Sequence, residues 1–332
     1  WATNSPLGPS VEPLVGEPGY RVLSDQTEYK ARHVVVATGL FQRAKIPAFA
    51  GDLPPAVLQL HSEQYRNPAA LPPGAVLVVG SGQSGCQIAE ELYRSGRQVY
   101  LSIGGAGRGP RRYRGKDIFE WLALTGFLRR TPDKLPSPQA RFAANPHVSG
   151  AAVGHDLNLH QVARDGVTLL GHLRGSHNGT LSLAPDRNES LAKSDGWTAT
   201  LLDMIDGYVA RAGLDAPGER PPVLRYGYAG DEIAQLDLAR AGVTSLIWAA
   251  GYRFDFDLVK LPVTDEFGFP IQQRGVTAYP GLYFVGLPWL RVHFITLGVL
   301  VQAAFGALPD LAATRRGAEA PATRWDIWLL LN

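Results

Sequence analysis

A glycine-rich turn between an apolar run and a helical pattern constrains the fold of this chain more than any other feature. Residues 76–79 are all apolar, residues 80–85 read Gly-Ser-Gly-Gln-Ser-Gly, and residues 88–92 have the apolar spacing of a helix. Residues 99–103 read as the next strand, so residues 75–103 predict a compact βαβ unit with a right-handed crossover. The sequence therefore predicts an α/β fold that contains a Rossmann-like domain.

The glycines of this turn have the spacing Gly80-x-Gly82-x-x-Gly85. A pyrophosphate can approach the backbone closely only where side chains are absent, and the following helix offers amide donors and the positive end of its dipole. The alternative is a tight strand-to-helix turn without a ligand, which the combination of strand, helix and second strand disfavours. We predict that a dinucleotide binds to Gly80, Ser81, Gly82, Gln83, Ser84 and Gly85.

The end of the second strand indicates which nicotinamide cofactor fits. An acidic residue there would bind the ribose 2′-hydroxyl of NAD, but the position holds Ser102, and no acid follows before Asp117. Arginines crowd the connection instead, and a guanidinium group matches a phosphate in charge and geometry. A solvated loop is the alternative interpretation of this cluster. We predict that NADPH is favoured over NADH, with its 2′-phosphate near Ser102 and one or two of Arg108, Arg111 and Arg112.

Length, charge and cysteine usage narrow the class of protein. The 332 residues are 45% hydrophobic, which suits two domains, and the net charge of +2 gives no field that would favour nucleic acid or a membrane surface. Cys86 is the single cysteine, which excludes an internal disulfide, a Cys-based zinc site and a CxxC redox pair, and favours a cytoplasmic location. The longest apolar stretch, residues 292–305, is too short and too polar to span a bilayer.

The rest of the chain predicts further strands and one insertion. Residues 31–39 form an apolar, β-branched run that ends in glycine, which suits a buried parallel strand. Residues 104–160 lack clear periodicity apart from an amphipathic piece at residues 117–128, and we interpret them as an insertion or a lid over a site. The remaining predicted strands are residues 166–173, 245–250 and 282–285, with a helix starting near Gly298.

Four separate motifs carry a resemblance to a known family. Residues 34–39 read Val-Val-Val-Ala-Thr-Gly and lead into a Phe-Ala-Gly element that ends at residue 51, and residues 61–65 read His-Ser-Glu-Gln-Tyr. Residues 247–256 repeat the pattern of a strand followed by glycine, and residues 282–289 form a last short strand with glycine after it. In combination these segments resemble the class B flavin monooxygenases, which include flavin-containing monooxygenase-like proteins and bacterial NAD(P)-binding, FAD-dependent oxidoreductases.

The resemblance implies two Rossmann-like domains, with an NADPH domain inserted into an FAD domain. Residues 1–66 and 244–332 would be the two FAD segments, and residues 67–243 the NADPH domain with its insertion. Such enzymes pass a hydride from NADPH to FAD and then transfer oxygen from O₂, through a C4a-hydroperoxyflavin, to a small nucleophilic (N or S) or carbonyl substrate. Tyr65, and the nine residues between Gly51 and His61, favour the heteroatom substrates.

The resemblance also implies which residues surround the flavin. Because the cofactors carry the chemistry, no catalytic side chain is assigned. His61 is either a contact at the hinge between domains or a helix-capping residue. No metal site is predicted at His155, Asp156 and His160, which lack further ligands. The residues that we expect to contact FAD are Ala37, Thr38, Gly39, Ala250, Gly251, Tyr252, Gly286, Thr296 and Gly298.

One departure from the family pattern leaves an alternative open. The family has a second glycine fingerprint, for FAD, on the first strand of its larger domain, and none stands before Ala31, because Gly8 and Gly16 do not follow a predicted strand. We therefore expect the FAD fingerprint to be missing from this sequence, which would leave an apolar sheet edge at residues 34–37 exposed. A non-catalytic NADPH-binding or scaffold protein is the alternative function. A pyridine nucleotide-disulfide oxidoreductase would need a pair of cysteines.

Overall fold

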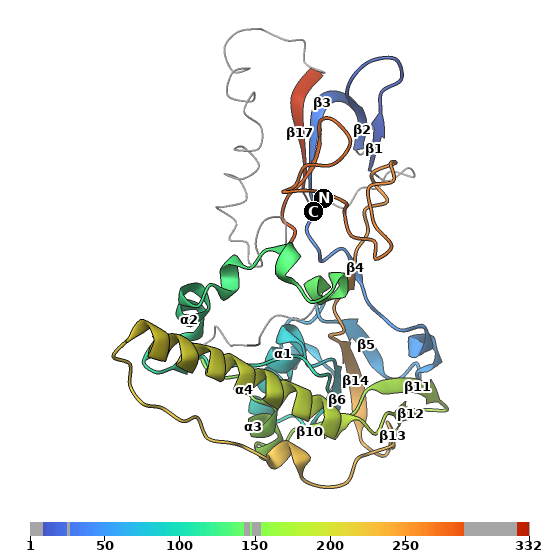
Figure 1. Cartoon of the computed structure of the whole chain (residues 1–332). Helices are drawn as coiled ribbons and strands as arrows, with labels where there is room; N and C mark the ends of the chain where they lie inside the picture. Colours follow the sequence, from blue (N-terminus) through green and yellow to red (C-terminus); the bar gives the residue numbers. More distant parts are fainter. Residues whose placement is uncertain (1–8, 25–26, 143–146, 148–153, 289–323, 332) are drawn as a thin grey trace. The chain divides into compact units, whose positions relative to one another are not determined.

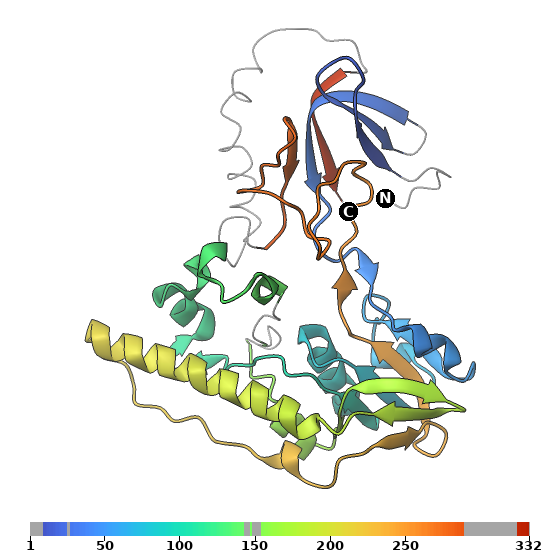
Figure 2. The same cartoon turned by 45° about the vertical axis from the view of Figure 1, so that its right-hand side comes forward.

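The structure is a computed structural model, in which the chain forms two compact units (Figures 1 and 2). It describes residues 9–24, 27–142, 147 and 154–288, and the backbone of residues 324–331. The first unit comprises residues 1–43, 128–141 and 252–332, and the second comprises residues 44–127 and 142–251. The cofactor-domain boundaries after residues 66 and 243 stay a prediction. Thr296, Gly298 and the apolar stretch at residues 292–305 lie outside the described residues.

The second unit is built on a five-stranded parallel sheet with the order β10–β7–β6–β14–β5 (Figure 1). The predicted βαβ unit is confirmed: β6 pairs with β7 in parallel, and helix α1 (Gln83–Arg94) connects them. The fold is thus of the mixed α/β class with a Rossmann-type sheet. The strands are β5 (Leu58–His61), β6 (Ala75–Val79), β7 (Val99–Ser102), β10 (Thr168–Leu170) and β14 (Val243–Trp248).

Two apolar clusters hold this parallel sheet between its covering layers. Because side chains alternate along a strand, Val76 and Val78 of β6 pack on one face, with buried residues of α1 and of α3 (Leu159–Arg164). Leu77, with Trp248 of β14, packs on the other face against a second layer. That layer consists of η1 (Ala48–Asp52) and the antiparallel strands β11 (Leu173–His177), β12 (Thr180–Leu183) and β13 (Gln235–Asp237).

Helix α4 (Arg187–Ala212) is the longest described helix, and no pattern in the sequence predicted it. It lies against the segment that follows β7, where glycines alternate with other residues. At Gly107 a Cβ atom would come within 2.6 Å of the Trp197 ring, so the segment can approach the helix only without a side chain there. The same close approach joins Gly105 to Lys193 and Gly109 to Leu201, one helical turn away in either direction.

The predicted insertion forms short elements. Its amphipathic piece becomes helix α2 (Ile118–Leu124), where the Asp117 carboxylate caps the helix by accepting a hydrogen bond from the Phe119 amide at 3.0 Å. Its role as a lid stays a prediction. The other short elements of the chain are β8 (Arg112–Tyr113), β9 (Lys116–Asp117), η2 (Pro68–Ala70), η3 (Phe127–Arg129), η4 (Pro132–Lys134), η5 (Pro138–Phe142) and η6 (Tyr226–Tyr228).

The first unit has a five-stranded sheet around the long strand β3 (Thr27–Ala37), which contains the predicted strand at residues 31–39 except its last two residues. Strands β1, β2 and β3 run antiparallel in succession, and β16 and β17 pair with β3 in parallel (Figure 2). Strand β4 (Arg43–Ala44) pairs with β15 (Tyr252–Arg253) in a separate two-stranded sheet. The remaining bounds are β1 (Ser10–Pro13), β2 (Tyr20–Ser24), β16 (Leu282–Phe284) and β17 (Arg324–Leu331).

Three expectations about strands were wrong. The edge of β3 is not exposed, because β17 pairs with it along residues 30–37. Gly16 does follow a strand, β1, but the turn leads into the antiparallel strand β2 and not into a helix. The predicted strand at residues 166–173 is divided between β10 and β11, which belong to different sheets. Gly171 lies where the chain changes sheet, and a Cβ there would collide with the Ala184 carbonyl oxygen.

The longest apolar stretch, which we expect to be too short and too polar to span a bilayer, lies outside the described residues. Within residues 9–24, 27–142, 147 and 154–288, no helix combines the length and the apolar character that crossing a bilayer requires.

The change of sheet at Gly171 can be tested by adding one methyl group. We expect Gly171→Ala to lower the free energy of unfolding by about 1–3 kcal/mol, because the backbone of residue 184 must move. Gly175→Ala is the matched control, since no atom lies within 4 Å of a Cβ there, and its effect should stay within about 0.5 kcal/mol. Urea unfolding of both variants measures the difference; equal stabilities would contradict the interpretation.

Candidate functional site

The three glycines of the predicted fingerprint have different surroundings. A Cβ on Gly80, whose φ is +107°, would lie 2.5 Å from the Ala249 carbonyl oxygen, and one on Gly85 would collide with the carbonyl oxygen of Gly80. These two glycines therefore allow α1 to pack against β6 and β14. Gly82 differs, because no atom lies within 4 Å of a Cβ there. The backbone at Gly82 consequently faces open space.

Gly82 is also the residue at which helix α1 begins. It is the N-cap, and as a glycine it offers the amides of the first turn no capping side chain. The positive end of the helix dipole therefore lies at a backbone that carries no side chain, directly after the carboxyl end of β6. Such an arrangement suits a phosphate group of a dinucleotide. Gly80 to Gly85 thus fit the group that the sequence predicts for them.

The sheet order places this turn at a topological switch point. From β6 the chain continues to β7 and then β10 on one side, whereas β14 and β5 lie on the other side. In open α/β sheets a crevice forms outside the carboxyl ends of the strands where the order reverses, and ligands bind there. The end of β6, where Gly80 contacts Ala249, is this position.

Ser102, predicted near the 2′-phosphate, has its side chain engaged inside the sheet. It is 3% exposed, and its hydroxyl donates to the Gly171 carbonyl oxygen at 2.9 Å, which links β7 to the end of β10. Ser81 makes a second connection: its Oγ accepts from the Gly104 amide at 2.9 Å and lies 3.2 Å from the Gly104 carbonyl oxygen. The glycine turn and the segment after β7 are therefore held together.

The three predicted arginines all have intramolecular partners. Arg108 forms an ion pair with Asp195 at 2.6 Å, and Arg111 forms one with Asp117 at 2.7 Å. Arg112 donates to the Gly154 carbonyl oxygen at 3.2 Å. Their side chains are thus used to fix the segment after β7 to other parts of the second unit. Binding of the 2′-phosphate by these arginines stays a prediction.

Asp195 is the centre of a polar network that the sequence did not reveal. Besides Arg108, its carboxylate accepts from the Tyr228 hydroxyl at 3.0 Å and from His160 Nε2 at 3.1 Å. His160 is fully buried, and its Nδ1 accepts from the Gly227 amide at 3.0 Å, which assigns the ring proton to Nε2. Burial alone would raise the pKa of Asp195, but the hydrogen bonds from His160, Arg108 and Tyr228 outweigh it and hold the pKa below its ordinary value.

His61, the last residue of β5, lies where the chain leaves the parallel sheet. It is 1% exposed, and its Nε2 lies 3.2 Å from the Gly251 carbonyl oxygen, which also accepts from the Lys45 amide at 2.9 Å. His61 and Gly251 both belong to the second unit, and the hinge and helix-capping interpretations of His61 both stay predictions. Gly251 and Tyr252 are two of the predicted FAD residues. Gly251 has a φ of +81°, and the ring of Tyr252 packs against Phe41 with 5.1 Å between the ring centroids.

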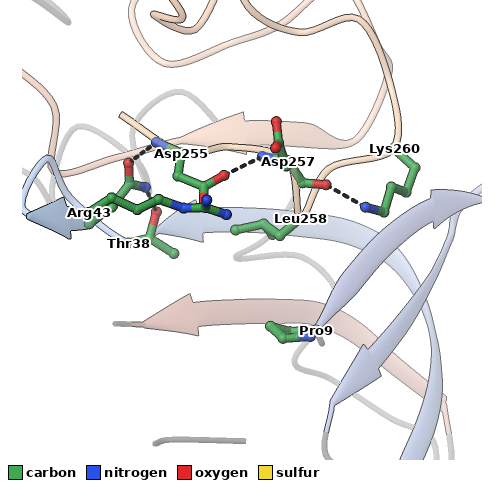
Figure 3. A pocket seen from close by; sticks show the side chains of 8 residues that line it. Pro9, Thr38, Arg43, Asp255, Asp257, Leu258 and Lys260 are labelled. Carbon is green, nitrogen blue, oxygen red and sulfur yellow. Dashed lines mark hydrogen bonds and ion pairs between the residues drawn. The ribbon is translucent and has the colours of Figure 1, made fainter. Parts of the chain in front are cut away.

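The first unit contains a polar cavity at the carboxyl end of β3 (Figure 3). Its volume is about 370 Å³, and Gln42 links its walls by donating to Thr38 Oγ1 at 2.8 Å and accepting from the Asp255 amide at 2.6 Å. Arg43 forms an ion pair with the Asp255 carboxylate. The residues that line the cavity are Pro9, Thr38, Gln42, Arg43, Asp255, Asp257, Leu258 and Lys260.

The predicted FAD residues among the described residues of the first unit are Ala37, Thr38, Gly39, Tyr252 and Gly286, and two of them face open space. Gly39 and Gly286 have φ values of +69° and +76°, and no atom lies within 4 Å of a Cβ on either. They follow β3 and β16, which pair in parallel. The described residues of this unit form no glycine-rich turn from a strand into a helix, so a site for the FAD pyrophosphate is not found among them.

The remaining candidate residues, which are His155, Asp156, His160 and Cys86, all contact other residues of the chain. His155 Nε2 lies 2.7 Å from Glu90 Oε1, and the Asp156 carboxylate accepts from the Arg111 amide, so these two residues and His160 belong to three separate contacts. Burial raises the pKa of Cys86 to about 12, and its Sγ lies 3.4 Å from the Ser81 carbonyl oxygen. Cys86 is a packing residue of α1.

Comparison with known proteins shows which proteins the chain resembles. A family profile described as pyridine nucleotide-disulphide oxidoreductase matches residues 10–121. The CzcO-like oxidoreductase of Geobacillus kaustophilus is 34% identical over 81% of this chain and 61% of its own length. The CzcO oxidoreductase of Bacillus subtilis is 27% identical over 81% and 62%. The structure of a variant flavin monooxygenase from Stenotrophomonas maltophilia superposes with a TM-score of 0.53 at 16% identity, over 92% of this chain and 70% of that one.

The chain thus resembles CzcO-like oxidoreductases in sequence and a flavin monooxygenase in fold. It spans about three fifths of the length of the curated relatives that it matches. This resemblance agrees with the Rossmann-type parallel sheet of the second unit. The structural likeness supports the fold.

The network around Asp195 gives a pH-dependent prediction. We expect Asp195→Asn to lower the free energy of unfolding at pH 7 by about 1–3 kcal/mol, because Arg108 loses its charged acceptor. The folded-state pKa lies below the ordinary value of 3.8, so this stabilisation is present above that pH and is lost as the pH falls through the folded-state pKa. The gap between variant and wild type in urea unfolding should therefore narrow below about pH 4.

The control for this experiment is Asp203→Asn, an exposed carboxylate on the same helix. Its effect on the free energy of unfolding should stay within about 0.5 kcal/mol at both pH values. A gap for Asp195→Asn that is constant with pH would contradict a role for the ionised carboxylate.

Proposed function

We propose that this chain binds NADPH through the turn at Gly80 to Gly85 and, with FAD, belongs to a monooxygenase that oxidises a small nucleophilic (N or S) or carbonyl substrate. The observation that supports it most is the environment of Gly82. Its backbone begins helix α1, faces open space, and lies at the switch point of a parallel sheet. A cytoplasmic location, favoured by the single cysteine, is part of the proposal.

The residues of the second unit have the task of binding and orientation. The first-turn amides of α1, with Ser81, Gly82, Gln83 and Ser84, would hold the pyrophosphate. Ser81 keeps the segment at Gly104 beside this turn, which fixes where the adenosine half can lie. Ser102 and the three arginines stay candidates for the 2′-phosphate, although each arginine would have to leave or share its present partner.

In the first unit, Thr38, Gly39 and Gly286 would lie next to FAD. Thr38 lines the polar cavity and is oriented by Gln42, and the two glycines expose backbone where no side chain intervenes. Ala250, Gly251 and Tyr252 would follow at the second passage of the chain. When bound, NADPH supplies a hydride and FAD passes the electrons to O₂ for oxygenation of the substrate. The protein contributes positioning and the exclusion of water, which is consistent with the lack of an assigned catalytic side chain.

Two other functions make different demands on the residues. Reduction of a disulfide through a redox-active cysteine pair does not suit these 332 residues, because Cys86 is their single cysteine and is buried. A non-catalytic NADPH-binding or scaffold protein is the alternative that the sequence leaves open. Both proposals include binding of NADPH, and only the monooxygenase proposal requires FAD.

The NADPH site can be tested with one substitution. We expect Gly82→Val to abolish binding of NADPH and NADH, because a branched side chain would fill the space that the pyrophosphate needs. The fold should survive, since no atom lies within 4 Å of a Cβ at Gly82, and circular dichroism would check this. Gly218→Val, at another glycine with open surroundings, is the control that should bind normally. Normal binding by Gly82→Val in a fluorescence titration would place the nucleotide elsewhere.

The oxygenase proposal is tested by following the oxygen atom. With added FAD, NADPH and a thioether or tertiary amine, we expect NADPH consumption and a product that carries one atom from ¹⁸O₂, detected by mass spectrometry. Gly82→Val should form no product. If FAD does not bind, or if NADPH binds without being oxidised, the non-catalytic alternative is supported instead.

A further inference from the structure

Three neighbouring strands of the parallel sheet end at the same edge. Val79 of β6 is in register with Ser102 of β7, and Ser102 is in register with Leu170 of β10. The segments that follow these strands are therefore adjacent in the order of the sheet: the glycine turn, then Gly104 with Gly105, and then His172. A nucleotide with its pyrophosphate at the glycine turn would extend its adenosine half toward the ends of β7 and β10.

Two side chains that can carry positive charge flank the segment after β7. A Cβ on Gly104 would lie 3.4 Å from His172 Nε2, and a Cβ on Gly105 would lie 3.0 Å from Lys193 Cδ. Neither glycine presents a side chain of its own. The side chains that can contact a ligand beside this segment thus come from the connection between β10 and β11 and from α4.

His172 is held in a defined orientation by Asp186. Its Nδ1 lies 2.8 Å from Asp186 Oδ2, and its backbone amide donates to Asp186 Oδ1 at 3.0 Å. With Nδ1 directed to the carboxylate, Nε2 is the ring atom on the side of Gly104. The other charged groups nearby are Arg174, 3.8 Å from Asp186, and Glu189, which pairs with Lys193 at 2.7 Å.

A phosphate that binds Lys193 would have to displace a different partner from a phosphate that binds Arg108. Lys193 is 63% exposed and is paired with a Glu four residues away on the same helix, and an exposed ion pair of this kind contributes little to stability. Arg108 is 14% exposed and donates to an Asp195 carboxylate that also binds His160 and Tyr228. Lys193 can therefore turn toward a phosphate at little cost, whereas Arg108 would leave a partly buried carboxylate with one donor fewer.

We propose that His172 and Lys193 bind the 2′-phosphate of NADPH and set the preference for NADPH over NADH. This inference rests on the proposed NADPH site and replaces the predicted arginines with two residues that face the segment directly after β7. Protonated His172 donates through Nε2, Asp186 fixes its ring, and Lys193 supplies a second positive charge. The ligand class recognised here is an adenosine 2′-phosphate.

The test is a set of titrations that separate the 2′-phosphate from the rest of the nucleotide. The dissociation constants of NADP⁺, NAD⁺ and 2′,5′-ADP are measured at pH 6.5 for the wild type, His172→Ala and Lys193→Ala. We expect each variant to weaken NADP⁺ and 2′,5′-ADP by about 10-fold or more, as for one charge-assisted hydrogen bond. Binding of NAD⁺ should change less than about twofold, because NAD⁺ has a hydroxyl at that position. Lys193→Arg should restore most of the NADP⁺ affinity.

Matched controls and the rival arginines make the outcome decisive. His177→Ala, on the same strand as Arg174, and Arg211→Ala, on the same helix as Lys193, should leave all three dissociation constants unchanged. If Arg108→Ala, Arg111→Ala or Arg112→Ala lowers NADP⁺ affinity selectively while His172→Ala and Lys193→Ala do not, the inference is overturned. Equal losses of NADP⁺ and NAD⁺ in the two variants also overturn it. If the wild type binds neither nucleotide, the proposed NADPH site fails, and the inference fails with it.

Discussion

The contact of three backbone segments at Gly80 is the constraint on which the site depends. Helix α1 reaches the end of β6 because Gly85 has no side chain to meet the Gly80 carbonyl, and Gly80 in turn lies against Ala249 of the segment after β14. This packing brings the start of the helix over the end of the sheet and leaves Gly82 open above it. Two glycines thus make the packing possible, and the third leaves the backbone open at the position of the proposed ligand.

A second constraint concerns how positive charge is distributed around the turn. Arginines near the end of β7 are chemically suited to a phosphate, yet those at 108 and 111 form ion pairs that hold the segment to α4 and to Asp117. The exposed positive charge at Gly105 comes from a lysine on α4, far away in sequence. Residue type alone therefore does not separate an arginine that binds a ligand from one that stabilises the fold.

The βαβ unit and the parallel strands were predictable because their signals are local: an apolar run, a glycine turn and helical spacing follow one another within residues 75–103. Helix α4 was not, because Gly196 and Gly207 stand within its sequence and polar residues such as Ser190 and Ser194 are buried on it, so its apolar pattern is weak. The glycine turn could be assigned for the same local reason. The pair of His172 with Asp186 and the network around Asp195 could not, because these contacts form only in the folded chain.

The glycines that alternate along the segment after β7 affect how this stretch can vary during evolution. Any replacement of Gly107 or Gly109 adds a Cβ within 2.7 Å of Trp197 or Leu201, whatever the chemistry of the new side chain. Selection there acts on volume before it can act on charge or hydrogen bonding. A lineage that changes its cofactor preference would therefore find fewer obstacles on the exposed surface of α4 than on the segment where such changes would first be sought.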